Sequence, residues 1–174
     1  MWKAKSKTKE PGNEIKAYEY AVFLLSLQLR TVGEIREKMA GRGYTSAIIE
    51  NVLERLHDNK YLDDERYAQV FLDNLKQYKN LGYYGIKKKF LMKKLPQELI
   101  SKVLDEGLSM DDELKIAKRF LKKGGVAVRS AADEGSSENS YNTFDEEKSK
   151  RKQKISAKLK SRGFRSEVIA KVIR

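Results

Sequence analysis

Cationic side chains dominate the chemistry that this chain can do, because the usual catalytic residue types are nearly absent. Among 174 residues there is one His and no Cys. The sequence has neither a Walker-type phosphate loop nor a metal-ligand spacing. The lack of Cys excludes disulfides, thiol catalysis and Cys-based zinc sites. We therefore expect no enzymatic activity, no metal and no cofactor.

The remaining candidates for acid–base chemistry have simpler explanations. His57 follows a helical run of apolar residues, near a helix end, where a partly exposed polar side chain is the commoner role. Asp63 with Asp64, and Asp111 with Asp112, each precede an apolar-periodic segment. Acidic residues in that place cap a helix, so we interpret both pairs as helix starts.

Basic residues recur at matching places along the chain. The 37 Lys plus Arg outnumber the 25 Asp plus Glu, which gives a net charge of +12 and favours a polyanionic partner such as nucleic acid. For any single lysine a solvated helix face is an equal alternative, but a repeated set can follow a phosphate backbone or an acidic groove. The predicted basic stripe consists of Arg36, Arg42, Lys87, Lys88, Lys89, Lys93, Lys94, Lys154, Lys158, Lys160 and Arg162.

Helical spacing places Lys89 and Lys93, or Lys154 and Lys158, on one side of a helix. Tyr83 and Tyr84 border the densest basic run. They either stack on bases or on a partner surface, or pack the hairpin turn, which is the commoner role of tyrosines at a turn.

Three copies of one helix-hairpin pattern must position these cations. Residues 35–53, 86–104 and 155–173 align without a gap, and every matched column keeps an apolar residue. Such self-similarity is typical of stacked repeats. The matched columns are Ile35, Ile86 and Ile155; Met39, Phe90 and Leu159; Tyr44, Leu95 and Phe164; Ile48, Leu99 and Val168; Ile49, Ile100 and Ile169; Val52, Val103 and Val172; Leu53, Leu104 and Ile173.

Each hairpin follows one further apolar-periodic segment, so the predicted unit is a helix triplet. Thr31 and Glu34 have capping-box spacing at one helix start, and Gly82 and Gly85 predict a turn before another. The sequence thus predicts an all-α fold, an elongated, curved array of three tandem three-helix repeats. Their expected bounds are residues 14–60, 61–107 and 108–174.

Two segments are expected to be disordered. Residues 1–13 combine lysines with Pro11 and Gly12, which predicts a basic tail, and about 124–147 form an acidic insert poor in large apolar residues. The longest apolar run, residues 21–25, is too short to span a bilayer, and the N-terminus lacks the apolar core of a signal peptide. We expect a cytoplasmic monomer without a membrane partner.

The segment 62–68, which reads LDDERYA, resembles the LDD-x-R-[YF]-A motif of the RecX family of bacterial recombination regulators. Hairpin positions resemble the same family: Arg30, Glu34, Ile35 and Gly43 upstream, Gly82, Ile86 and Phe90 downstream, and Leu159, Arg162, Gly163 and Phe164 in the third copy. Lys94 departs from the pattern, since the family usually has glycine there, and the insert is longer than usual. The motif residues carried over, as structural or contact residues, are Leu62, Asp63, Asp64, Arg66, Tyr67, Ala68, Gly82 and Gly163.

The resemblance implies a modulator, mainly an inhibitor, of the RecA recombinase. Such a protein binds the RecA filament on single-stranded DNA and limits strand exchange, ATP hydrolysis and the repressor cleavage of the SOS response. Capping of filament ends and filling of the groove both stay open. Two alternatives remain: a stand-alone helical nucleic-acid-binding module, acting on duplex DNA as well, and a structural adaptor for another protein.

Overall fold

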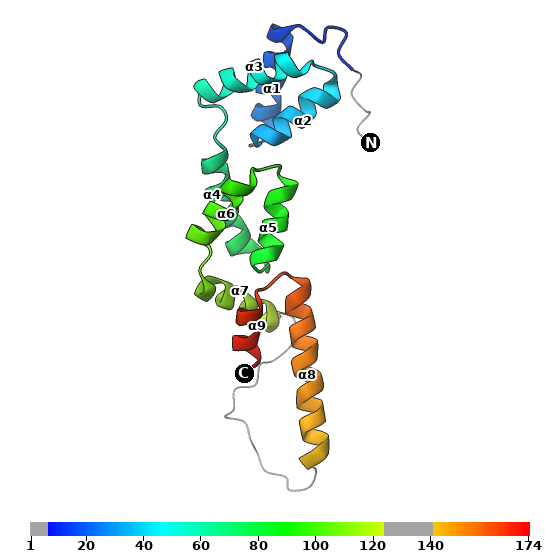
Figure 1. The fold of residues 1–174 in the computed structure, drawn as a ribbon, viewed down its shortest axis with the longest axis vertical. Helices are drawn as coiled ribbons and strands as arrows, with labels where there is room; N and C mark the ends of the chain where they lie inside the picture. Colours follow the sequence, from blue (N-terminus) through cyan, green and yellow to red (C-terminus); the bar gives the residue numbers. More distant parts are fainter. Residues whose placement is uncertain (1–6, 124–140) are drawn as a thin grey trace. The chain divides into compact units, whose positions relative to one another are not determined.

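The structure is a computed structural model that describes residues 7–123 and 141–174, with the backbone alone for 141–147. The described part contains nine α-helices and no strand, in three successive sets of three (Figure 1), which confirms the predicted all-α class and its three-helix repeats. The helices are α1 (Glu14–Leu27), α2 (Val32–Arg42), α3 (Ser46–Asp58), α4 (Asp64–Tyr78), α5 (Tyr83–Met92), α6 (Gln97–Gly107), α7 (Met110–Lys123), α8 (Tyr141–Ser161) and α9 (Ser166–Ile173).

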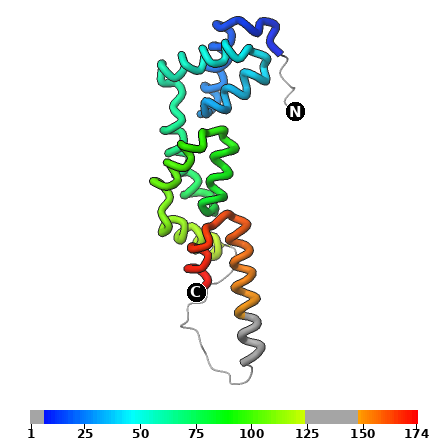
Figure 2. The backbone as a smooth tube through the Cα atoms, in the orientation of Figure 1, coloured from blue at the N-terminus to red at the C-terminus, as the bar shows by residue number. Residues whose placement is uncertain are grey.

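The backbone, traced in Figure 2, divides into two compact units. The first compact unit contains residues 1–71 and 89–101, and the second contains 72–88 and 102–174. Helices α4, α5 and α6 each pass from one unit into the other. The repeat boundaries at residues 60 and 107 stay a prediction.

The matched apolar columns form the core in all three copies. Ile35, Ile86 and Ile155 are all buried, and so are the members of the columns that begin with Met39, Tyr44, Ile49 and Val52. Ile48, Leu99 and Ile173 are half-buried. In the first unit α1, α2 and α3 contact one another pairwise, and in the second unit α9 contacts both α7 and α8. The period read from the sequence therefore gives the buried face correctly.

Helices α2, α5 and α8 end on a left-handed residue at the same register position. Gly43 has φ +96°, Gly163 has φ +77° and Lys94 has φ +58°. A left-handed residue closes a helix because it turns the chain back, so that N–H groups beyond the helix reach its last carbonyls, and glycine does so without a Cβ penalty. Lys94 thus adopts the conformation for which the family uses glycine.

In the first unit the start of α2 is fixed by residues far along the chain. The Thr31 hydroxyl donates to the Lys93 carbonyl at 2.5 Å, and the Val32 N–H donates to Asp64 Oδ1 at 2.9 Å. Thr31 is fully buried and also forms the predicted capping box with Glu34. Three backbone N–H groups at this helix start, which lack intrahelical partners, are thereby satisfied: those of Thr31, Val32 and Glu34.

The second unit repeats this arrangement at the start of α5. The Tyr83 N–H donates to Glu113 Oε1 at 3.0 Å, and the Gly82 N–H donates to the Arg162 carbonyl at 3.1 Å. Tyr83 has the register of Val32, and Arg162 has the register of Lys93. At each of these places a helix start meets the C-terminal cap of a later hairpin helix. We call such a place, with the side chains that bond the helix start there, a joint.

Both joints need close backbone approach. A Cβ on Gly82 would lie 2.3 Å from the Phe164 Cα, and a Cβ on Gly33 would lie 2.4 Å from the Lys94 Cβ. A Cβ on Gly85 would lie 2.3 Å from the Arg162 carbonyl oxygen. Gly85 lies inside α5, not in a turn before it as the sequence predicted, and packing explains why the position needs glycine.

The Arg42 carbonyl has the register of the Lys93 and Arg162 carbonyls, and it accepts a hydrogen bond from the N-terminal segment. The Thr8 N–H donates to the Arg42 carbonyl at 2.7 Å, and the Thr45 N–H donates to the Pro11 carbonyl at 3.2 Å. Asn13 caps α1 by accepting from the Lys16 N–H at 3.0 Å. Backbone hydrogen bonds thus join part of the predicted basic tail to the first hairpin. The disorder of this tail stays a prediction, and residues 1–6 lie outside the described part.

Helix α8 begins at Tyr141, so residues 141–147 of the predicted acidic insert are helical. The bounds and the disorder of the insert stay a prediction. Charged residues in sequence do not prevent helix formation when their intrinsic helix propensity is high. The rest of the insert, residues 124–140, lies outside the described residues.

Candidate nucleic-acid interface

Three consecutive lysines of α5 are among the unneutralised cations of the predicted stripe. Lys88 and Lys89 are exposed and Lys87 is half-buried. Among the described residues no ion pair joins any of the three to a carboxylate. Lys87 and Lys88 belong to the second unit and Lys89 to the first. Their charges are available to a polyanion.

Arg36, in contrast, already forms an ion pair with a carboxylate of the first unit. Its Nε and Nη2 donate to the two oxygens of Glu50 at 2.9 and 2.8 Å. This fork-to-fork geometry is the strong form of an Arg–carboxylate pair, and the hydrogen bond from Arg36 lowers the pKa of Glu50. Arg36 therefore joins α2 to α3, and its charge is largely matched.

Lys93 also forms an ion pair, and it lies beyond the end of α5. The helix ends at Met92, so the expectation that Lys89 and Lys93 share a helix face was wrong because the cap turns the chain there. Lys93 Nζ lies 3.0 Å from Glu34 Oε1. Burial acts to lower the pKa of Lys93, but hydrogen bonds to Glu34 and Tyr67 raise it above its ordinary value.

The other two cations of the first unit are partly engaged. The Arg42 guanidinium lies 5.4 Å from the centre of the Tyr20 ring. Lys94 Nζ lies 3.8 Å from Glu37 Oε1, and both side chains are at least half exposed. An exposed pair at that distance contributes little to stability, so Lys94 keeps most of its capacity to meet another anion.

In the second unit α8 presents an exposed cationic surface. Lys154, Lys158 and Lys160 are exposed, and Lys154 and Lys158 lie one helical turn apart as predicted. Arg162 follows the end of α8, with its guanidinium 5.1 Å from the centre of the Phe120 ring. None of the three lysines is ion-paired within the described part of the chain.

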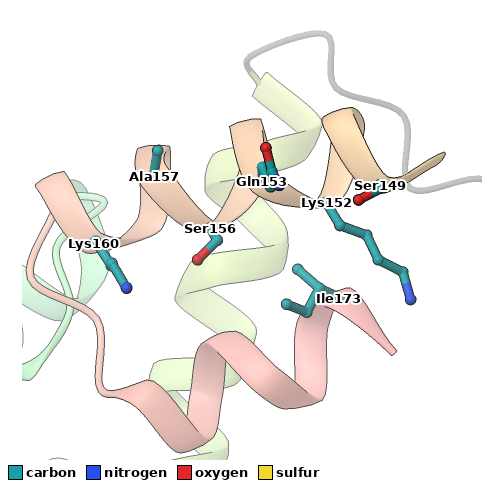
Figure 3. A pocket seen from close by; sticks show the side chains of 7 residues that line it. All are labelled: Ser149, Lys152, Gln153, Ser156, Ala157, Lys160 and Ile173. Atoms are coloured by element: carbon teal, nitrogen blue, oxygen red, sulfur yellow. The ribbon is translucent and has the colours of Figure 1, made fainter. Parts of the chain in front are cut away.

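A depression of about 380 Å³ lies between α8 and the end of α9 (Figure 3). Ser156 and Lys160 point from α8 toward α9, where Ile173 closes the depression. Its walls offer ammonium and hydroxyl groups without a paired carboxylate or imidazole. The lining residues are Ser149, Lys152, Gln153, Ser156, Ala157, Lys160 and Ile173.

Tyr83 and Tyr84 differ sharply in their surroundings. The Tyr83 hydroxyl lies 3.3 Å from Asp105 Oδ1, and the Arg165 guanidinium lies 5.1 Å from the Tyr83 ring. Burial and then Asp105 raise the pKa of Tyr83. Tyr84 is 59% exposed, with its ring edge-to-face against Tyr83 at 5.4 Å. Tyr83 packs the turn, and Tyr84 faces solvent.

The LDDERYA segment forms the start of α4 and contributes Asp64 to the first joint. Leu62 and Ala68 are buried, and Asp63 caps α4 by accepting from the Arg66 N–H at 2.9 Å. Asp64 holds the start of α2, as described above, and Arg66 is exposed. Burial raises the pKa of the Asp64 carboxyl, although the Val32 N–H lowers it.

The remaining motif side chain, Tyr67, is half-buried. Its ring lies 5.7 Å from the ring of Phe71, which in turn lies 5.4 Å from Phe90. Tyr67 thus contributes to core packing and also keeps an exposed edge.

The sequence analysis did not single out Glu113, which follows the acidic pair Asp111 and Asp112. Glu113 is fully buried and accepts from Arg165 and from the Tyr83 N–H. The signal that could have found it is its register: Glu113 precedes Ala117 and Leu121 as Asp64 precedes Ala68 and Leu72. Each of the two carboxylates accepts a backbone N–H at the helix start of a joint.

The structure brings no catalytic constellation together within the residues it describes. His57 is three-quarters exposed beside Asp58, and no group of three or more metal-ligating side chains occurs in the described ranges. No helix in that part of the chain is long and apolar enough to cross a membrane. Fold and surface together define a class: an α-helical repeat protein with an unneutralised basic surface.

Comparisons with known proteins agree with this class. The family model of the first three-helix domain of RecX matches residues 17–56. A regulatory protein RecX of Geobacillus sp. (strain WCH70) is 31% identical over 108 residues, which are 62% of this chain and 40% of that protein. Another, of Trichlorobacter lovleyi, is 26% identical over 154 residues, which are 87% of this chain and 90% of that protein.

Solved structures show the same fold. The crystal structure of RecX from Lactobacillus salivarius has a TM-score of 0.71 at 20% identity and covers 92% of this chain and 94% of that one. A crystal structure of another regulatory protein RecX has a TM-score of 0.72 at 21% identity, over 91% of this chain and 72% of that one. The chain is thus similar to RecX proteins in sequence and in fold, as its motifs indicated.

The chain spans between 40% and 64% of the length of the first curated relatives that it matches. Those relatives are named regulatory protein RecX.

Proposed function

We propose that this chain regulates the RecA recombinase by binding the RecA filament on single-stranded DNA. Its main effect would be inhibition of strand exchange, of ATP hydrolysis and of RecA-dependent repressor cleavage. The observation that carries the proposal is the similarity to proteins named regulatory protein RecX, over as much as 91% of this chain. Such regulation requires binding surfaces and no active site.

The exposed lysines of α5 and α8 are the proposed contact residues. A filament on DNA presents phosphates, which attract cations whose charge is not already matched. Lys87, Lys88 and Lys89 meet this condition, as do Lys154, Lys158 and Lys160, because the described carboxylates form no ion pair with them. Arg36 and Lys93 contribute less, since Glu50 and Glu34 already hold them.

The test is the rate of single-stranded-DNA-dependent ATP hydrolysis by RecA from the same source, with DNA in excess and increasing amounts of this protein. Inhibition well below one copy per RecA protomer supports the proposal. Replacing Lys87, Lys88 and Lys89 by Glu should abolish most of it. The control replaces Lys115, Lys118 and Lys122 of α7 by Glu, which changes the charge equally at three exposed positions.

A second candidate is a stand-alone nucleic-acid-binding module, which the unpaired lysines of α5 also favour. Its mark would be strong binding to duplex DNA without RecA, falling steeply with salt concentration. Such binding with no effect on RecA at equal amounts would replace the first proposal by the second.

A further inference from the structure

Tyr84 stands at the second joint, where two helices bring cations beside an exposed aromatic ring. Its N–H donates to the Gly163 carbonyl at 2.8 Å, so the backbone that carries the ring is fixed to the cap of α8. The ring is 59% exposed and rests edge-on against Tyr83. A fixed ring with a free face costs little conformational entropy to use in binding.

Tyr83 is itself held from three sides. Glu113 accepts its N–H, Asp105 its hydroxyl, and Arg165 lies over its ring. The neighbour that supports the Tyr84 ring therefore cannot easily move aside. This rigidity distinguishes Tyr84 from tyrosines that only project from a helix surface.

Two lysines of α5 and the arginine at the cap of α8 lie on the two segments that meet at Tyr84, and the Arg162 guanidinium lies 5.1 Å from the centre of the Phe120 ring. Lys87 and Lys88 follow Tyr84 by three and four residues within α5 and thus lie on its side of the helix. Arg162 belongs to the cap of α8, whose residue Gly163 touches the backbone of Tyr84 and Gly85. Lys87 and Lys88 have no carboxylate partner among the described residues.

We propose that Tyr84 is a base-stacking residue of a single-stranded DNA site at this joint, with Lys87, Lys88 and Arg162 as its phosphate contacts. Single strands are bound by this combination, an aromatic face for a base beside cations that follow the backbone. A duplex keeps its bases stacked and offers no free face to the ring. The inference rests on the proposed function, since it names the part of the filament that this site meets.

The experiment measures the affinity of the full chain, without RecA, for two labelled oligodeoxynucleotides of equal length by fluorescence anisotropy. One is an oligothymidylate and the other is abasic at every position, so that both carry the same phosphates. Tyr84→Ala should weaken binding of the oligothymidylate by at least about five-fold, the lower end for one stacked base. It should leave binding of the abasic strand unchanged, and Tyr84→Phe should keep wild-type affinity for both.

Tyr61→Ala is the matched control, because Tyr61 is 58% exposed and lies in the other unit; it should bind both strands as the wild type does. Lys87→Gln with Lys88→Gln should instead weaken both strands equally and reduce the salt dependence by about 0.7 per lost phosphate contact. Circular dichroism and urea melts establish that each variant is folded.

The inference is overturned if Tyr84→Ala weakens both strands equally, if it weakens neither, or if the wild type does not prefer the base-bearing strand. A loss of RecA-filament binding alone would make Tyr84 a protein contact, which also overturns it. Wild-type inhibition of RecA without base preference sinks only this inference. Base preference without an effect on RecA sinks only the proposed function.

Discussion

Glu113 binds Arg165 twice, although 52 residues separate them. The Arg165 N–H lies 2.9 Å from Glu113 Oε1, and the Arg165 side chain donates to Oε2. Because Oε1 also accepts from the Tyr83 N–H, one buried carboxylate joins α7 to the starts of α5 and α9. No other acidic side chain among the described residues is fully buried.

Glu113→Ala should destabilise the protein by about 3–5 kcal/mol, because it leaves the Arg165 charge and the Tyr83 N–H without their acceptor. Urea denaturation followed by circular dichroism measures the loss. Glu113→Gln, which keeps one acceptor oxygen, should lose less. Glu167→Ala on the exposed side of α9 is the control. A loss as small as that of Glu167→Ala would mean that the joint contributes no stability.

Gly163→Ala should cost at least about 2 kcal/mol, since the residue has φ +77° and a Cβ would lie 2.2 Å from the Gly85 nitrogen. Gly41→Ala provides a contrast within a helix. Nothing lies within 4 Å of a Cβ at Gly41, so this change should stabilise α2 by about 0.5–1 kcal/mol. Thermal melts of the two variants should shift in opposite directions, and a shared direction would contradict the close approach at the second joint.

Lys94→Gly should stabilise the protein by about 0.5–1 kcal/mol. Lys94 has φ +58°, and glycine removes the cost of the left-handed conformation while adding some chain entropy to the unfolded state. Lys89→Gly, inside α5, should instead destabilise by about 1 kcal/mol. Urea midpoints of the two single variants test the opposite signs. If Lys94→Gly also lowers the midpoint, the side chain stabilises more than its backbone costs.

The pH dependence of stability should carry two contributions of opposite sign. The Lys76 hydrogen bond lowers the pKa of Asp112 below its ordinary 3.8, so the unfolded chain takes up this proton first as pH falls. The stability that Asp112 contributes is present at neutral pH and is lost as pH falls through its folded value. Asp112→Asn should therefore be less stable than wild type at neutral pH and equal to it in acid.

Asp64 should behave in the reverse way. Burial raises its pKa above 3.8, so the folded chain binds the proton more tightly and stability falls as pH rises through the raised value. Asp64→Asn, which keeps an oxygen for the Val32 N–H, should lack this fall. Urea titrations across the acidic range compare both variants with wild type. Parallel curves for Asp64→Asn and wild type would show that the carboxyl is not desolvated.

Local sequence determined the helices and their buried faces. Thr31 and Glu34 predicted a capping box that the structure contains, and the column of Ile35, Ile86 and Ile155 is buried in each copy. These features depend on neighbours three or four residues away, which a sequence displays directly. The family motif was legible for the same reason, since its residues are contiguous.

Only the tertiary structure decided which polar groups meet across the joints. Asp64 was interpreted as a helix-start acid and Glu113 was not singled out, yet their partners lie 32 and 52 residues away. Likewise, the sequence placed Arg36 and Lys87 in one basic stripe without a difference between them. In the structure only Arg36 has a carboxylate partner, Glu50. Hydrogen bonds and charge pairing follow from distances in space, which helical periodicity does not encode.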